Sequence, residues 1–113
     1  MKSSIDAQIK RGSAELAILS VLAEGSLHGY EIAKRIEQQT DSVLRFDVAS
    51  LYPMLYRMEK RGWVKGEWKL LRNGRSRRCY HLTPAGRAKL VPLRRQWQMF
   101  FEALNRLASL DNA

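Results

Sequence analysis

The stretch from Leu51 to Leu82 has the sequence LYPMLYRMEKRGWVKGEWKLLRNGRSRRCYHL, and it decides which fold we expect. Its first part shows the residue spacing of a helix. Its second part shows two short strand patterns around Asn73-Gly74, a pair typical of hairpin turns. The stretch carries nine Lys or Arg and two Glu side chains, a net +7 of the chain's +9. This order predicts a recognition helix followed by a two-stranded wing, with positive charge where a winged helix contacts DNA.

The composition indicates one globular domain with an acidic partner. The chain has 113 residues, of which 45% are hydrophobic and 27% charged, enough for a small core and an appended helix. A sequence pI near 10.2 implies binding to nucleic-acid phosphates or to an anionic membrane surface. Much of the charge lies between two strand patterns and not beside a broad apolar helical face, so DNA is favoured over a membrane.

The sequence favours a cytoplasmic location. Residues 1–8 lack the apolar segment of a signal peptide, and no stretch approaches the roughly 20 apolar residues that span a bilayer. The single cysteine, Cys79, cannot form an internal disulfide, which agrees with a reducing compartment.

A first helix is predicted at the start of a winged helix-turn-helix domain that covers residues 13–83. Residues 14–23 are apolar on most faces, and Ser13 is available as the N-cap. We expect residues 1–12, which precede this helix, to form an arm or a short helix.

A second helix of about residues 28–39 is predicted after a connecting turn at residues 25–29. Charged and amide side chains occupy its outer face. Its apolar stripe toward the core consists of Tyr30, Ile32, Ala33 and Ile36.

The third helix has a core face and an exposed face that residue spacing separates. Leu51, Leu55 and Met58 follow the i, i+4, i+7 pattern of a buried stripe. Asp47 or Ser50 can cap this helix, and Pro53 favours a start near Ser50 because proline is tolerated in the first turn. The exposed residues that we expect to contact DNA are Ser50, Tyr52, Pro53, Tyr56, Arg57 and Lys60. The alternative is that the two tyrosines cover neighbouring helices and the cations are only solvated.

Residues 63–68 and 77–82 alternate as two antiparallel strands do, and the link between them is rich in arginine. Such a wing can lie along a minor groove and bind the flanking phosphates. The alternative is a charged edge that only keeps the protein soluble. Arginine clusters at Arg72, Arg75, Arg77 and Arg78, and the residues that we expect to contact DNA are Arg72, Asn73, Arg75 and Arg77.

Residues 84–113 are predicted to form a C-terminal dimerisation helix and tail, with Thr83 as N-cap and Pro84 as the first helical residue. Its apolar residues are spaced 3, 4, 3, 4 and 3 apart, as in helices that pair with a partner helix. We therefore expect a homodimer, the alternative being a helix that folds back on its own domain. Pro92 should kink or break the helix. The expected dimer-interface residues are Leu90, Leu93, Trp97, Phe100, Leu104 and Leu107.

Four motifs occur in the order in which PadR-type transcriptional regulators have them, and the resemblance covers about residues 13–108. The motifs are His28-Gly29-Tyr30-Glu31, Ser50-Leu51-Tyr52-Pro53-Met54-Leu55, Met58-Glu59-Lys60-Arg61-Gly62-Trp63-Val64 and Tyr80-His81-Leu82-Thr83-Pro84-Ala85-Gly86. The resemblance implies a homodimeric winged helix-turn-helix repressor whose third helix and wing contact operator DNA. The chain is similar to the compact subgroup, which has a single C-terminal dimerisation helix.

The resemblance also implies a candidate effector site. In some compact members, an aromatic residue on the last helix lines a flat hydrophobic pore between subunits that binds planar drugs. Trp97 is the matching residue here, so a small planar hydrophobic effector is the expected ligand. The alternative is that Trp97 only packs in the helix interface.

No pattern in the chain predicts an enzyme or a cofactor. His28 and His81 have no evident carboxylate partner in the sequence. Cys79 and His81 together make two metal ligands, whereas a structural zinc site needs four. Oxidation of Cys79 as a redox signal stays an alternative to simple packing in a strand.

Two functions remain open at this level. The first is a sequence-specific homodimeric repressor on a pseudo-palindromic operator, with half-sites about 34 Å apart. The second is a basic protein-interaction module or a non-specific nucleic-acid binder. The sequence does not identify the operator, the target genes or an inducer, and it does not separate repression from activation.

Overall fold

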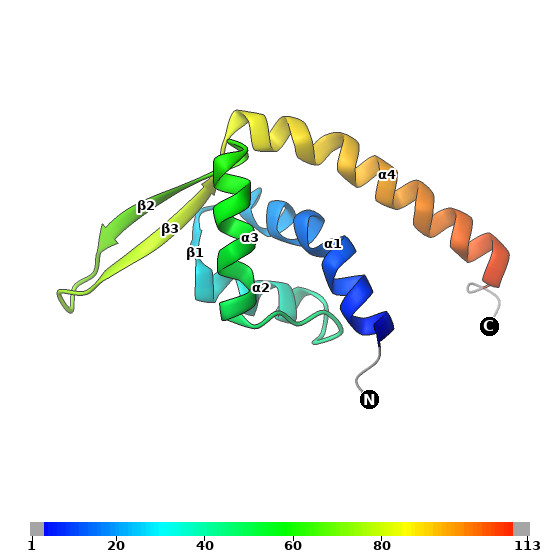
Figure 1. Ribbon diagram of the computed structural model, residues 1–113, viewed down its shortest axis with the longest axis horizontal. Coiled ribbons are helices and arrows are strands. Elements are labelled where there is room, and N and C mark those ends of the chain that lie inside the picture. Colours follow the sequence, from blue (N-terminus) through cyan, green and yellow to red (C-terminus); the bar gives the residue numbers. More distant parts are fainter. Residues whose placement is uncertain (1–3, 110–113) are drawn as a thin grey trace.

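The computed structural model describes the backbone of residues 4–109 and the side chains of residues 12–109 (Figure 1). The end of the predicted C-terminal tail, residues 110–113, lies outside the described residues. The described chain confirms a mainly helical winged helix-turn-helix fold with a small sheet and a long C-terminal helix. Its elements are α1 (Ser4–Leu22), β1 (Leu27–His28), α2 (Gly29–Gln39), α3 (Val48–Lys60), β2 (Val64–Leu70), β3 (Ser76–Leu82) and α4 (Pro84–Ala108).

The core lies where one face of each of α1, α2 and α3 meets the sheet and the start of α4. The predicted core residues of α3 are all buried, which confirms the helical spacing. The prediction that Tyr30 belongs to the apolar stripe of α2 is wrong, because its side chain is 59% exposed. The largest fully buried side chains are Ile18, Leu19, Ile32, Ile36, Leu51, Leu55, Met58, Val64 and Leu90.

Two helices begin earlier than predicted. The first helix is continuous from Ser4, so Ser13 lies inside it and is not the N-cap. Helix α3 begins at Val48, before the start near Ser50 that Pro53 favoured. Asp47, one of the two predicted caps, occupies the N-cap position, but its side chain makes no capping hydrogen bond. Pro53 therefore lies inside α3 and not in its first turn. Tertiary packing supplies most helical stability, so a helix can extend past a potential capping residue or include a proline.

The sheet has three strands in the order β1-β3-β2, and both pairs are antiparallel. The prediction that the residues of β1 belong to a connecting turn is wrong. Its two residues are too short to show alternation, and they form a strand only because β3 pairs with them, Leu27 with Tyr80 and His28 with Cys79. The hairpin turn contains Gly74 at φ +82°, a left-handed conformation that glycine adopts without strain.

Helix α4 begins as predicted. Thr83 is its N-cap, and the threonine hydroxyl accepts a hydrogen bond from the Gly86 amide at 3.0 Å. The helix continues through Pro92 to Ala108, so the predicted break at Pro92 is wrong. Gly86 packs directly on the backbone, since a Cβ at this position would lie 2.0 Å from the Trp63 carbonyl oxygen.

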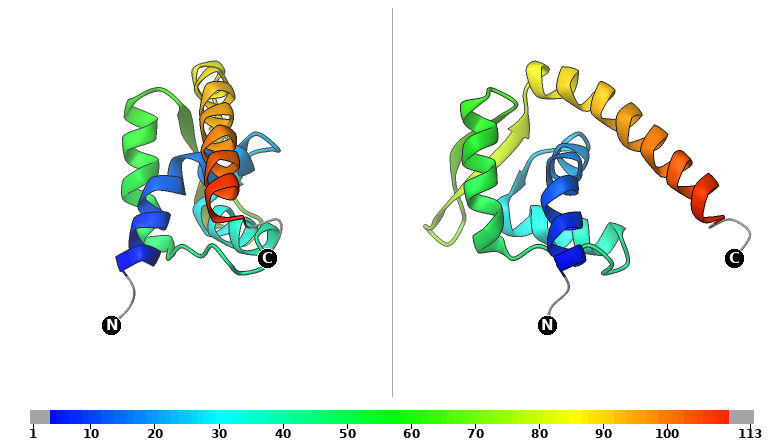
Figure 2. Two further views of the ribbon diagram at one scale, coloured as in Figure 1. Left: turned by 90° about the vertical axis from the view of Figure 1, so that its right-hand side faces the viewer. Right: turned by 45° about the vertical axis from the view of Figure 1, so that its right-hand side comes forward.

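Two segments project on opposite sides of the core, the β2–β3 hairpin and the C-terminal half of α4 (Figures 1 and 2). The Cα radius of gyration is 15.7 Å, whereas a compact domain of this length has about 13 Å. The two projections account for the difference. None of the helices in the described range combines the length and apolar character that crossing a membrane requires.

Candidate nucleic-acid interface

The six residues of the third helix that were predicted to contact DNA all lie on the exposed face of α3. Ser50, Tyr52, Pro53, Tyr56, Arg57 and Lys60 are all exposed. The ammonium of Lys60 lies 5.1 Å from the centre of the Tyr56 ring. Arg57 has no carboxylate partner among the described residues. This face therefore offers three hydroxyls and two cations that a polyanion can contact.

The hairpin turn carries Arg72, Asn73 and Arg75, and all three side chains are exposed. The Asn73 Oδ1 accepts a hydrogen bond from the Arg75 amide at 3.0 Å, so this side chain shapes the turn. Arg77 is exposed on β3 near His28. The prediction that Arg78 belongs to the exposed arginine cluster of the wing is wrong, because this side chain is only partly exposed and binds Glu59.

The Glu59–Arg78 pair joins α3 to the wing. The Glu59 Oε2 accepts a hydrogen bond from Arg78 Nη2 at 2.7 Å and another from the Gly66 amide at 3.2 Å. The hydrogen bond to Glu59 raises the pKa of Arg78 above its ordinary value. The Arg78 guanidinium lies flat over Gly66, where a Cβ would be 2.6 Å from Arg78 Nε. The pair therefore sets the position of the wing relative to α3.

Two aromatic rings complete the surroundings of Arg78. Its guanidinium carbon lies 5.7 Å from the Trp68 ring centre and 5.9 Å from the Tyr80 ring centre. Burial raises the pKa of the Tyr80 phenol, and the nearby Arg78 only partly opposes that shift. Sequence reasoning missed this cluster, because Glu59 and Arg78 lie far apart in the chain and neither neighbourhood signals the other.

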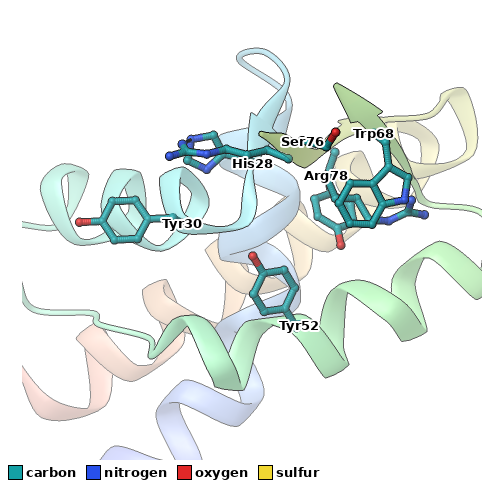
Figure 3. Close-up of a pocket in the computed structure, with 8 residues that line it drawn as sticks. His28, Tyr30, Tyr52, Trp68, Ser76 and Arg78 are labelled. Carbon is teal, nitrogen blue, oxygen red and sulfur yellow. Dashed lines mark hydrogen bonds between the residues drawn. The ribbon is translucent and has the colours of Figure 1, made fainter. Parts of the chain in front are cut away.

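An open groove of about 580 Å³ lies between α3, the start of α2 and the sheet, and we call it the helix–wing groove. Figure 3 shows the Tyr52 hydroxyl pointing from α3 toward the side formed by β1 and α2. Gly29 permits this, because a Cβ there would lie 2.7 Å from the Tyr52 hydroxyl oxygen. The lining residues are His28, Tyr30, Tyr52, Trp68, Ser76, Arg77, Arg78 and Tyr80.

His28 begins α2 in a reciprocal capping arrangement. Its Nδ1 accepts a hydrogen bond from the Glu31 amide at 3.3 Å, and Glu31 Oε1 accepts one from the His28 amide at 3.1 Å. Glu31 Oε1 also lies 3.2 Å from His28 Nε2. His28 thus has a carboxylate neighbour that the sequence reasoning did not identify. The S/T-x-x-E spacing of capping boxes, here with histidine at the cap, was the available signal.

The predicted dimer-interface residues divide into two groups. Leu90 is 2% exposed within its own chain, so it belongs to the domain core and not to the predicted interface. Leu93 is partly buried and packs against the same core. The remaining four, Trp97, Phe100, Leu104 and Leu107, lie farther along α4, where Trp97 is half-buried and the other three are exposed.

An aromatic cluster marks the middle of α4. The ring centres of Trp97 and Phe100 are 5.8 Å apart, and those of Trp97 and Phe101 are 5.5 Å apart. Phe101 also lines a shallow apolar groove of about 380 Å³ with Glu102, Leu104 and Asn105. Sequence reasoning missed Phe101, because it lies one position outside the predicted stripe.

The described part of the chain contains no cluster of potential metal ligands. Nowhere from residue 12 to residue 109 do three or more His, Cys, Asp or Glu side chains gather as metal ligands. Cys79 is a half-buried free thiol in β3.

The comparisons with known proteins agree with this arrangement. The family described as "Transcriptional regulator PadR-like family" matches residues 18–91. The transcriptional regulator Rv3488 of Mycobacterium tuberculosis is 34% identical over 88 residues, which cover 78% of each chain.

Solved structures of transcriptional regulators share this fold, and two of them are similar over nearly their whole length. A transcriptional regulator from Clostridium thermocellum is 30% identical with a TM-score of 0.78, over 88% of this chain and 96% of the other. A PadR-like regulator from Bacillus cereus is 28% identical with a TM-score of 0.77, over 89% and 96%. Bacillus subtilis PadR, solved in complex with operator DNA, is 23% identical with a TM-score of 0.63, over 68% of this chain and 44% of that one. This last likeness concerns the fold alone.

Proposed function

Since this chain belongs to the PadR-like family of transcriptional regulators, we propose that it is a sequence-specific repressor that binds a pseudo-palindromic operator as a homodimer. The observation that carries the proposal is the joint surface of α3 and the wing. Its cations Arg57, Lys60, Arg72 and Arg75 have no carboxylate partner among the described residues. The acids on the same two elements face other groups, since Glu59 of α3 is paired with Arg78 and Glu67 of β2 lies 3.6 Å from His81 Nδ1. Such a surface matches the phosphate backbone.

The exposed face of α3 supports the assignment of direct base contacts to this helix. An α-helix fits the major groove, where arginine can donate two hydrogen bonds to guanine. We assign Arg57 to that role, with Tyr52, Tyr56 and Lys60 binding bases or phosphates beside it. Ser50 and Pro53 complete the contact surface at the start of the helix.

The wing supplies the second contact. Arg72, Asn73, Arg75 and Arg77 extend from the sheet and suit a minor groove and its flanking phosphates. Bacillus subtilis PadR, which shares the fold, was solved with operator DNA, and this supports the same docking here.

The exposed stripe of α4 supports a homodimer. Phe100, Leu104 and Leu107 are 52%, 42% and 85% exposed in the single chain, and an isolated apolar stripe of this kind suits a second helix. Two heads joined through α4 could bind half-sites about one helical turn, or about 34 Å, apart. A flat hydrophobic effector at Trp97 and a cytoplasmic location complete the proposal.

The experiment is binding of the purified chain to a labelled duplex from upstream of its own gene, with random duplex as competitor. Retention of the complex supports operator recognition. Arg57→Ala should lower the preference for the operator over random DNA, whereas Arg75→Ala should weaken both about equally. Complete loss to the competitor would favour a basic interaction module, and identical behaviour of the two variants would contradict the division between helix and wing.

A titration with planar hydrophobic dyes tests the effector site. Binding at Trp97 should quench tryptophan fluorescence, and Trp97→Phe should remove that quenching. Trp68→Phe is the matched control, since Trp68 lies on the wing. Equal quenching in the Trp97 variant and the native chain would exclude Trp97 as the platform.

A further inference from the structure

At the helix–wing groove, two hydrogen-bond donors lie beside the ring of His28: the Glu31 amide and the Arg77 guanidinium. A neutral imidazole accepts at only one nitrogen. The Nδ1 of His28 accepts from the Glu31 amide, so Nε2 carries the hydrogen. Arg77 Nη1 lies 2.7 Å from that same Nε2, and a guanidinium can only donate. The contact therefore sets two donors face to face. Glu31 Oε1, 3.2 Å from Nε2, can accept from the ring, but Arg77 has no acceptor among the described residues.

The groove itself offers little to satisfy them. None of its lining residues, all within the described range, is Asp or Glu. The nearest carboxylates are engaged, Glu59 by Arg78 and Glu31 by the start of α2. Among described groups the Tyr52 hydroxyl has no hydrogen-bond partner either, and it points into the groove (Figure 3). Three donors thus converge on a space with a surplus of positive charge.

The place of the groove in the fold indicates the acceptor. It separates α3 from the wing. When α3 occupies a major groove and the wing the adjacent minor groove, the sugar-phosphate backbone that divides those grooves must pass between the two elements. A phosphodiester supplies acceptor oxygens with a negative charge, and arginine binds such groups in the most favourable geometry.

We propose that the helix–wing groove holds one backbone phosphate of the bound DNA. Arg77 is its main ligand, with His28 Nε2 beside it, and the Tyr52 hydroxyl donates from α3. Gly29 is part of the site because only a residue without Cβ lets the Tyr52 phenol lie against the start of α2. The inference rests on the proposed function and assigns it one phosphate at a defined position.

Fluorescence anisotropy with a labelled random-sequence duplex tests this, at several KCl concentrations and with the full chain. Arg77→Gln should weaken binding and lower the slope of log K against log [KCl] by about 0.9 per subunit. Arg87→Gln is the matched control, because it removes the same charge from an exposed arginine at the start of α4, and it should keep the native slope. Tyr52→Phe should weaken binding by about tenfold without changing the slope.

The outcomes separate the two proposals. Equal slopes for Arg77→Gln and Arg87→Gln, with thermal unfolding unchanged, would overturn the phosphate site while leaving DNA binding intact. Absence of duplex binding by the native chain would overturn the proposed function and this site with it. Inorganic phosphate at constant ionic strength should compete no better for the native chain than for Arg77→Gln. Stronger competition for the native chain would assign the groove to a free anion instead.

Discussion

The β2–β3 hairpin and the C-terminal half of α4 (residues 97–108) both project from the core, but they are stabilised in different ways. The hairpin is held to α3 by Glu59, which binds both Arg78 and Gly66. Residues 97–108 present Phe100 and Leu107 to solvent with no comparable contact to the core. Polar contacts within the chain thus already position the wing, whereas the apolar surface of α4 is left exposed in the single chain.

This difference has an energetic basis. A charge-assisted hydrogen bond that is partly shielded from water contributes about 1.5–3 kcal/mol and depends on geometry. Burying apolar surface contributes about 25 cal/mol per Å² and tolerates different partners. The first suits a wing that must match the spacing of DNA grooves, as we propose, and the second suits the proposed pairing of α4 with its own copy.

The largest effect is expected where the two projections join. Gly86→Ala would place a Cβ 2.0 Å from the Trp63 carbonyl oxygen and 2.8 Å from Leu82 Cδ1. Because a backbone atom cannot move aside cheaply, we expect a loss of about 3 kcal/mol or more in the free energy of unfolding. Urea unfolding followed by circular dichroism measures it.

Gly12→Ala is the control for this substitution. Its Cβ would meet only the Trp97 ring, at 3.8 Å from Cη2 and 4.0 Å from Cζ2, which is ordinary contact. Since alanine is favoured over glycine inside a helix, we expect a gain of about 0.5–1 kcal/mol. Equal effects at the two positions would mean that the contact between α4 and the wing does not limit stability.

The next effect separates the two halves of α4. Leu90→Ala removes a buried side chain and should cost about 2–5 kcal/mol in any state of association. Leu107→Ala changes a side chain that is 85% exposed in the single chain, so it should act mainly by weakening the dimer. Sedimentation at several protein concentrations distinguishes them, and an unchanged association constant for Leu107→Ala would argue against its place in the interface.

A smaller effect tests how the wing is held. Glu59→Gln keeps an oxygen for the Gly66 amide but removes the charge that binds Arg78, and we expect a loss of about 1 kcal/mol. Glu15→Gln is the control, because the Glu15–Arg61 pair at 3.2 Å is more exposed and should contribute at most about 0.5 kcal/mol. Thermal melts give both values, and equal losses would show that the Glu59–Arg78 pair has no special role.

The smallest effect is confined to alkaline solution. Burial raises the pKa of Tyr80 above its usual value of 10.0, so the folded chain holds this proton more tightly than the unfolded chain. Stability should therefore decline as pH rises above about 10, and Tyr80→Phe should lessen that decline. Urea midpoints across this pH range measure it. Tyr56→Phe, on an exposed ring, should leave the decline in place, and the idea fails if both variants behave alike.

The presence of the helices, the hairpin and the basic stretch could be predicted from the sequence, because these features depend on residues that are close in the chain. The buried face of α3 follows from the spacing of Leu51, Leu55 and Met58, and the start of α4 follows from Thr83 and Pro84. The exposed DNA-facing side chains were placed correctly on the surface, although their contacts with DNA stay predictions.

The partner that covers each apolar or charged group depends on the tertiary structure alone. Leu90 and Leu107 belong to the same sequence pattern, yet one is buried in the core and the other is exposed. Strand β1 exists because β3 pairs with it, and Arg78 leaves the wing cluster because Glu59 reaches it from α3. Periodicity indicates which face of an element is apolar, but the neighbour that meets this face depends on contacts between residues far apart in the chain.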